Sequence, residues 1–147
     1  MNTKPQYLWS EENGTAFCTI FYKNYTFTGE AQCHPDDRDM MSKLTGQSIA
    51  EARAALKYLR FIRDCELRPQ LKSLYQLYYS MKHSKKFAPR GYEAKMLYKQ
   101  IHHLENDMAE IKIEIQKVKK FLYDYIEQKE KDHKKIRAKK ALAEDNQ

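Results

Sequence analysis

The stretch that decides the fold is residues 97–125, LYKQIHHLENDMAEIKIEIQKVKKFLYDY. Its apolar residues recur at alternating steps of four and three, which is typical of the seam of a left-handed coiled coil. These residues are Leu97, Ile101, Leu104, Met108, Ile111, Ile115, Val118, Leu122 and Tyr125. A single helix cannot bury such a seam in water. We therefore expect it to pack against a partner, either an earlier helix of the same chain or the same helix of another copy.

The preceding segment is predicted to be helical over residues 47–82. Its alanines at 50, 52, 54 and 55 would let another element approach closely. Pro69 should break or kink it, because proline in a helix interior removes a hydrogen bond and clashes with the preceding turn. A short cationic connection containing Pro89 and Gly91 then predicts an antiparallel helical hairpin, whose long helix is expected over 92–128.

Further upstream, the hydrophobic pattern changes to a period of two. This predicts a β-hairpin over residues 16–33 that turns near Lys23-Asn24. Gly29 in the second strand indicates a bulge, or a place where a ligand or another backbone comes close. An isolated hairpin is only marginally stable, so we expect it to pack on the helices or to extend a sheet with another copy.

The fold class predicted from these patterns is α+β, mostly α: an N-terminal β-hairpin or small antiparallel sheet, then a long antiparallel helical hairpin with coiled-coil character. Residues 16–128 are expected to form a single domain. Residues 1–15 are expected to be an irregular arm, and a short helix over 35–45 should end at Gly46. Residues 129–147 are charged on every side, which predicts a basic, frayed helical tail.

The charge balance favours a partner that carries phosphates. The chain has 27 Lys and Arg against 20 Asp and Glu, a net charge of +7. Several of its 11 tyrosines stand beside basic residues, a combination suited to stacking a base while pairing its phosphate. No apolar run approaches the length of a transmembrane helix, and no signal-peptide pattern opens the sequence. These features predict a soluble intracellular protein.

Catalytic and metal-binding motifs are not found in the sequence. It contains no GxSxG, HExxH or Walker pattern, so we expect a protein that is not an enzyme and uses no cofactor. Its cysteines, Cys18, Cys33 and Cys65, form no CxxC pair, which argues against a zinc site or a disulfide framework. Buried, unreactive thiols are the expected alternative.

Two groups of residues could contact an anionic ligand. Arg90 and Tyr92 stand at the start of the long helix, where free backbone N–H groups would add to an anion site. Arg53 and Lys57 lie four residues apart on one helix face and could grip phosphate. The alternative interpretation of both groups is an ordinary solvated loop and a solvated helix face.

The segment FTGEAQCHPDDRDMMSKLTGQSIAEARA, residues 27–54, resembles the Thoeris anti-defence protein family. These phage proteins bind and hide the cyclic ADP-ribose signals made by bacterial TIR enzymes. The shared pattern is Gly-x-Ala-x-Cys-x-Pro-x-Asp followed by Gly-x-x-Ile-Ala-x-x-Arg-Ala. Its positions here are Gly29, Ala31, Cys33, Pro35, Asp37 or Asp36, Gly46, Ile49, Ala50, Arg53 and Ala54. Where the pattern commonly has an aromatic residue after the Asp, this sequence has Arg38-Asp39-Met40.

The resemblance implies a phage protein that sequesters a cyclic nucleotide immune signal in the cytoplasm of the bacterial host without degrading it. The signal would be a cyclic ADP-ribose isomer, with cyclic oligonucleotides as a further class. A homo-oligomer, dimeric or higher, would hold the ligand between protomers. The candidate contacts are Phe27, Arg53, Lys57, Arg90 and Tyr92. The alternative is a coiled-coil phage regulator that binds nucleic acid or a host protein.

Overall fold

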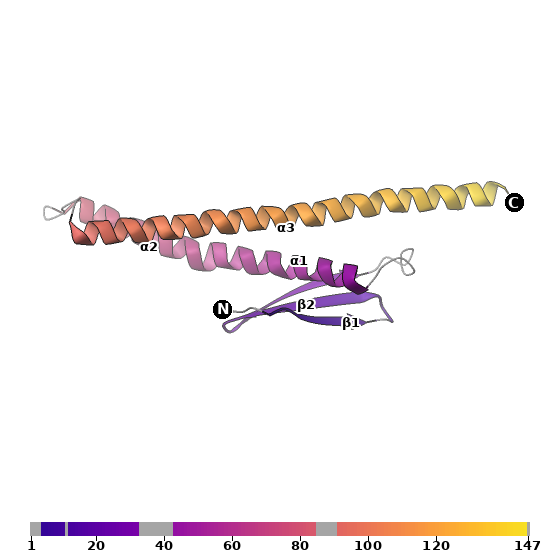
Figure 1. Ribbon diagram of the computed structural model, residues 1–147, viewed down its shortest axis with the longest axis horizontal. Coiled ribbons are helices and arrows are strands. Elements are labelled where there is room, and N and C mark those ends of the chain that lie inside the picture. Colours follow the sequence, from indigo (N-terminus) through magenta and orange to yellow (C-terminus); the bar gives the residue numbers. More distant parts are fainter. Residues whose placement is uncertain (1–3, 11, 33–42, 85–90, 147) are drawn as a thin grey trace. The chain divides into compact units, whose positions relative to one another are not determined.

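The computed structural model describes residues 4–10, 12–32, 43–84 and 91–146 (Figure 1). A small sheet comes first and helices follow, so the predicted α+β, mostly α fold class is confirmed. In chain order the elements are β1 (Gln6–Ser10), β2 (Thr15–Tyr22), β3 (Tyr25–Gln32), α1 (Lys43–Phe61), the π-helix η2 (Ile62–Leu67), α2 (Arg68–Lys82) and α3 (Tyr92–Asp145).

The chain divides into two compact units. The first, which we call the sheet unit, contains the described residues up to Lys57 together with those from Lys117 onward. The second, the helical unit, is Tyr58–Gln116. Both α1 and α3 contribute to each unit.

The sheet has three antiparallel strands in the order β1-β2-β3. In its register, Cys18 of β2 lies opposite Tyr7 of β1 and Gly29 of β3. The predicted hairpin turn is confirmed, since β2 ends at Tyr22 and β3 begins at Tyr25. Lys23 has a φ of 53°, a left-handed conformation that short hairpin turns require.

The first strand corrects the expected irregular arm over residues 1–15. Residues 6–10 pair with β2 along their whole length, from Gln6 opposite Thr19 to Ser10 opposite Thr15. Five residues are too few to give a clear alternation. The strand exists because β2 offers an unpaired edge that lies next to it along the chain.

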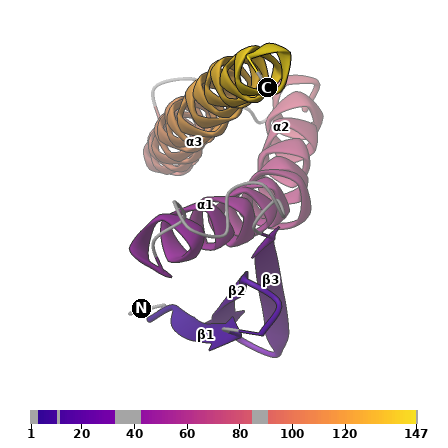
Figure 2. The same cartoon turned by 90° about the vertical axis from the view of Figure 1, so that its right-hand side faces the viewer.

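Helix α1 packs on one face of the sheet (Figure 2). A Cβ built on Gly29 would lie 2.0 Å from the carbonyl oxygen of Ala50 and 2.5 Å from the backbone nitrogen of Ala54. The close approach expected at Gly29 is therefore made by the backbone of α1. The buried residues of this interface are small or aliphatic: Ala16, Cys18, Ile20, Ala31, Ile49, Ala50 and Ala54.

The start of α1 differs from the prediction at Gly46. The helix begins at Lys43 and continues through this glycine, which therefore does not end a helix. Gly46 is buried within this helix. The rest of the short helix expected over 35–45 falls mostly on residues outside the described part of the chain.

The expected interruption before Pro69 takes the form of a π-helix. The backbone N–H of Arg68 bonds to the carbonyl of Arg63, five residues earlier. Pro69 then occupies the first turn of α2. Proline has no N–H and its ring clashes with the carbonyl four residues before it, so one wider turn accommodates it without ending the helix.

Helices α2 and α3 form the predicted antiparallel pair within the helical unit. Tyr75 contacts Glu105, whereas Tyr78, later in α2, contacts Tyr98, earlier in α3. Their shared core contains five buried residues, namely Leu67, Leu71, Leu97, Ile101 and Met108. Leu104 and Ile111 pack against this core. Over residues 97–111, the seam therefore packs on an earlier helix of the same chain.

Helix α3 begins at the predicted Tyr92 and extends through the basic tail to Asp145. Residues 129–145 are thus regular helix rather than a frayed end. Contacts one turn apart support this segment: Glu127 pairs with Lys131 at 3.7 Å, and Gln128 donates to Asp132 at 3.1 Å. Each such pair adds about 0.2–0.5 kcal/mol to helix stability.

Candidate functional site

A groove of about 600 Å³ lies between α2 and α3 in the helical unit and is a candidate ligand site. This volume is in the range of small-molecule sites. Leu71 and Met108 of the core contribute its apolar lining. We call it the Tyr-Lys groove, after the residues described next.

Three cations line one end of the Tyr-Lys groove. Arg68 and Lys72 lie one turn apart on α2, and Lys112 faces them from α3. The helices are antiparallel, and Tyr75 of α2 contacts Glu105 of α3. Arg68 and Lys112 are each seven residues from these contacting residues, about 10 Å along the helix axis in the same direction, so they lie level with one another. No Asp or Glu belongs to the lining, so this end attracts anions.

Two tyrosines line the other end of the groove, where Tyr75 is 38% and Tyr79 58% exposed. The Tyr75 hydroxyl donates to the carboxylate of Glu105, and this hydrogen bond raises the pKa of Tyr75 above its usual value. The Tyr75 phenol therefore stays neutral at physiological pH. Partial exposure leaves ring surface for a planar group to stack on.

The Tyr79 ring is supported from behind by other aromatic side chains. Tyr78 meets it edge-on, with ring centroids 5.8 Å apart. Tyr78 in turn packs on Tyr98 at 5.2 Å, and the Tyr98 hydroxyl donates to that of Tyr78 at 2.9 Å. The Tyr79 ring thus has an edge contact with a tyrosine that itself packs on α3.

A second groove between the same helices, about 530 Å³ in volume, has different chemistry. Gln70 and Ser73 line it from α2, and Gln100 and His103 from α3. His103 lies 3.5 Å from Asp107. This groove has no Lys or Arg in its lining and serves as an internal comparison for the Tyr-Lys groove.

Two of the sequence-predicted site residues, Arg53 and Lys57, are brought together along β3. Arg53 Nη1 donates to the carbonyl oxygen of Glu30 at 2.5 Å, and Lys57 Nζ donates to that of Thr28 at 2.7 Å. Both cations thus bind the outer edge of the sheet in this structure. That contact is structural, and the ligand role predicted for them stays a prediction.

The other predicted site residues are distributed over both units. Phe27 is half-buried on β3 and shares the α1-facing side of the sheet with Gly29 and Ala31. Tyr92 begins α3 in the helical unit and is 77% exposed. Arg90 lies outside the described residues.

The positions that carry the family resemblance are mainly packing residues here. Gly29 and Ala31 face α1, and Ile49, Ala50 and Ala54 are the α1 residues buried at this interface or closest to Gly29. Their spacing allows α1 to pack closely against the sheet. Among the described residues, the shared pattern thus accounts for the packing of α1 on the sheet, and none of its positions belongs to the lining of the Tyr-Lys groove.

The cations and tyrosines of the Tyr-Lys groove were not among the predicted site residues. Lys72, Tyr75 and Tyr79 recur at steps of three and four on α2, beside the apolar face of Leu71, Leu74 and Tyr78. That spacing is visible in the sequence. Lys112 could be added only after the alignment of α3 against α2 was known.

The two cysteines among the described residues differ in burial. Cys18 is buried as expected, and burial first, with the nearby Glu51 second, raises its thiol pKa to about 11. Cys65 is exposed, so the expectation of a buried thiol is wrong there. Residues two apart on a helix point to nearly opposite sides, and Leu67 is the one that is buried. Cys33 lies outside the described residues.

The described part of the chain contains no group of three or more His, Cys, Asp or Glu residues that could hold a metal ion. Within those same residues, none of the helices combines the length and apolarity needed to cross a bilayer. Comparison with protein-family models, with curated proteins and with solved structures found no match to this chain.

Proposed function

We propose that this protein binds and sequesters a phosphate-bearing cyclic nucleotide in the Tyr-Lys groove and leaves it chemically unchanged. The observation that carries the proposal is the separation of the groove into a cationic end, Arg68, Lys72 and Lys112, and an aromatic end, Tyr75 and Tyr79. A nucleotide has the same division into phosphates and base.

The dimensions of the groove agree with this ligand class. Lys72 and Tyr79 are seven residues apart on α2, which corresponds to about 10 Å along the helix axis. This is about the distance that a phosphate and a base spanned by a ribose require. Cations pairing the phosphate and a tyrosine stacking the base would then act on one ligand at once.

The resemblance of residues 27–54 to Thoeris anti-defence proteins supports one member of this class, a cyclic ADP-ribose isomer. On this proposal the protein is a phage factor that acts in the bacterial cytoplasm by hiding an immune signal, as a homo-oligomer. Competition with a sensor requires nanomolar affinity, about 12 kcal/mol, which favours a groove whose rings are already in place.

A retention experiment tests the proposal. The purified protein is incubated with cyclic ADP-ribose isomers and with cyclic di- and trinucleotides, filtered, and heat-denatured. We expect intact nucleotide to be released only after denaturation. Release of altered nucleotide would show an enzyme, and retention of none of these nucleotides would overturn the proposal.

Matched variants locate the site. Lys72→Ala should weaken retention about 10- to 100-fold, because a charge-assisted contact contributes about 1.5–3 kcal/mol. Tyr79→Ala should act similarly through lost stacking. Gln70→Ala and His103→Ala, in the second groove, should bind as the unmodified protein does. Arg90→Ala and Arg53→Ala test the residues predicted from the sequence.

The alternative is a phage regulator that binds nucleic acid, and the long basic end of α3 favours this second candidate. Six Lys and Arg residues lie within 131–140, all of them at exposed positions. Binding through this segment would weaken steeply with salt as counterions are released. Removing residues 131–147 would then abolish it, whereas nucleotide retention in the groove would be unaffected.

A further inference from the structure

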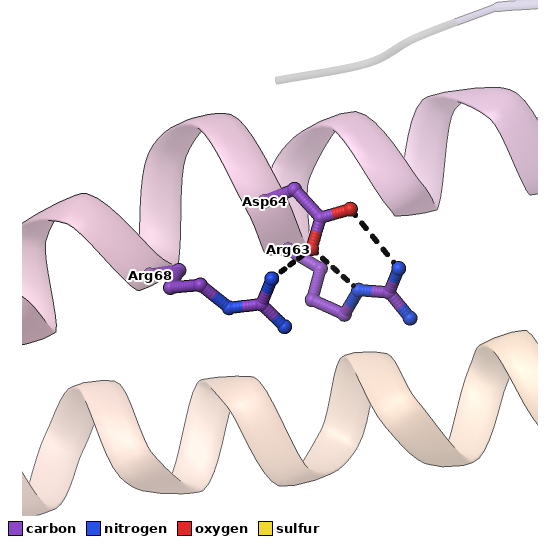
Figure 3. Close-up of polar contacts among 3 residues, drawn as sticks. All are labelled: Arg63, Asp64 and Arg68. Atoms are coloured by element: carbon purple, nitrogen blue, oxygen red, sulfur yellow. Dashed lines mark hydrogen bonds and ion pairs between the residues drawn. The ribbon is translucent and has the colours of Figure 1, made fainter.

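The groove cation Arg68 is held by a carboxylate that lies outside the groove lining. Asp64 Oδ1 forms an ion pair with Arg68 Nη1 at 3.0 Å, one helical turn away (Figure 3). The Arg68 side chain is 61% exposed. A long side chain with so much exposure would otherwise sample many rotamers, and the contact with Asp64 restricts its direction.

Asp64 is itself held by a second arginine. Arg63 donates through Nε to Oδ1 at 2.8 Å and through Nη2 to Oδ2 at 3.0 Å, a two-point contact that fixes the carboxylate plane. This contact, with Arg68 beside it, lowers the pKa of Asp64 below its usual value. Asp64 therefore stays ionised at physiological pH.

The cluster lies where η2 joins α2. Asp64 and Arg68 are four residues apart, a spacing that puts two side chains on one face of a helix. Arg63 reaches Asp64 as its neighbour in sequence, and the backbone N–H of Arg68 bonds to the Arg63 carbonyl, so the π turn spans the same residues. Single π turns occur frequently at functional sites.

The charge of the cluster suits an anion site. Two arginines and one aspartate leave a net charge of +1, so Asp64 orients Arg68 without cancelling the attraction for phosphate. A guanidinium has five N–H donors, of which the contact with Asp64 uses an Nη1 donor. Its fork geometry suits a phosphate at the cationic end of the groove.

We infer that Asp64 is a positioning residue, which holds Arg68 in the direction needed to bind the phosphate of a nucleotide in the Tyr-Lys groove. The inference rests on the proposed function of that groove. It predicts a change in affinity opposite to the one expected from charge alone. Removing a negative charge near an anion site normally strengthens binding, whereas removing the Asp64 charge should weaken it here.

The test compares Asp64→Asn with a matched control, Glu110→Gln, which neutralises an exposed acid on α3. Affinity is measured by calorimetry for whichever cyclic nucleotide the unmodified protein retains. We expect Asp64→Asn to raise the Kd about 3- to 10-fold, and Glu110→Gln to leave the Kd unchanged or lower it. Equal or tighter binding by Asp64→Asn overturns the inference and leaves the proposed function intact.

A double-mutant cycle separates positioning from general stability. In an Arg68→Ala background, Asp64→Asn should have no further effect on Kd, because the side chain through which Asp64 acts is gone. A persistent loss would mean that Asp64 acts by another route. Circular dichroism and the melting temperature show whether each variant keeps its helices.

A second readout does not need a nucleotide. Nitrogen-15 relaxation of the Arg68 side chain should show restricted motion in the unmodified protein and faster motion in Asp64→Asn, with Arg53 as the internal reference. Identical Arg68 motion in both proteins overturns the inference. If the unmodified protein retains no nucleotide at all, the proposed function fails first, and the inference fails with it.

Discussion

Lys57 Nζ donates a 2.7 Å hydrogen bond to the carbonyl oxygen of Thr28, and Arg53, one turn earlier in α1, does the same to Glu30. Four residues of a helix span about 6 Å and two residues of a strand about 6.6 Å, so the two spacings match. The two carbonyls belong to β3, an outer strand of the sheet. The cations of α1 thus cover backbone groups that could otherwise pair with another strand.

Replacing both cations should expose this edge. We expect Arg53→Met with Lys57→Met to lower the free energy of unfolding by about 1–2 kcal/mol, because two hydrogen bonds to the backbone are lost. The variant should also self-associate through β3. Urea unfolding and light scattering measure these effects. Lys95→Met, at an exposed position on α3, controls for added surface hydrophobicity. A monodisperse variant of unchanged stability would show that these contacts do not protect the edge.

Gly29→Ala should destabilise the sheet unit strongly. The new methyl group would meet the backbone of Ala50 and Ala54 rather than the end of a flexible side chain, so α1 must move away from the sheet. We expect a loss of about 2–3 kcal/mol in urea unfolding. Thr26→Ala, at an exposed position on the same strand, should change stability by less than about 0.5 kcal/mol. Similar losses for both variants would contradict the close packing.

Leu71→Ala should destabilise the helical unit, because Leu71 belongs to the core shared by α2 and α3. A cavity of this kind typically costs about 2–5 kcal/mol. Leu77→Ala is the matched control on the same helix, since Leu77 is 50% exposed and should cost far less. Thermal unfolding followed by circular dichroism would distinguish the two. If Leu77→Ala destabilised the protein as much as Leu71→Ala, the two side chains would contribute equally to packing, which would contradict the prediction.

Alkaline pH should weaken the sheet unit through Cys18. Its thiol pKa is raised from 9.0 to about 11, so the folded state favours the protonated form. The stability that this provides is fully present below pH 9 and is lost as the pH rises to about 11. We expect a loss of about 1–2 kcal/mol across that window in urea unfolding, and a smaller loss in Cys18→Ala. An equal loss of stability with pH in the unmodified protein and in Cys18→Ala would show that ionisation of Cys18 is not the cause.

Thiol reactivity at neutral pH provides an independent check of the cysteine environments. In a Cys33→Ser background, Cys65 should react rapidly with a disulfide reagent, because it is exposed, whereas Cys18 should react only on unfolding. Mass spectrometry of the labelled peptides identifies which thiol reacted. Rapid labelling of Cys18 in the folded protein would contradict its burial.

The local patterns of apolar residues could be recognised in the sequence. The three- and four-residue spacing from Leu97 to Ile111 predicted the buried side of α3, and the period of two in residues 16–33 predicted the hairpin of β2 and β3. These predictions succeed because a helix or strand must turn its apolar side away from water, whatever it packs on. Gly29 likewise indicated a close approach, since only glycine leaves room for another backbone.

The tertiary structure decided which surfaces meet. The spacing of the seam allowed α3 to pair either with a helix of its own chain or with another copy. In the helical unit, α3 pairs with α2 of the same chain, as the contact between Tyr75 and Glu105 shows. The same alignment brought Lys112 level with Arg68 and so created the Tyr-Lys groove. The sequence determined the amphipathic elements because their periodicity is local. The groove depends on residues some forty positions apart, and only packing fixes their register.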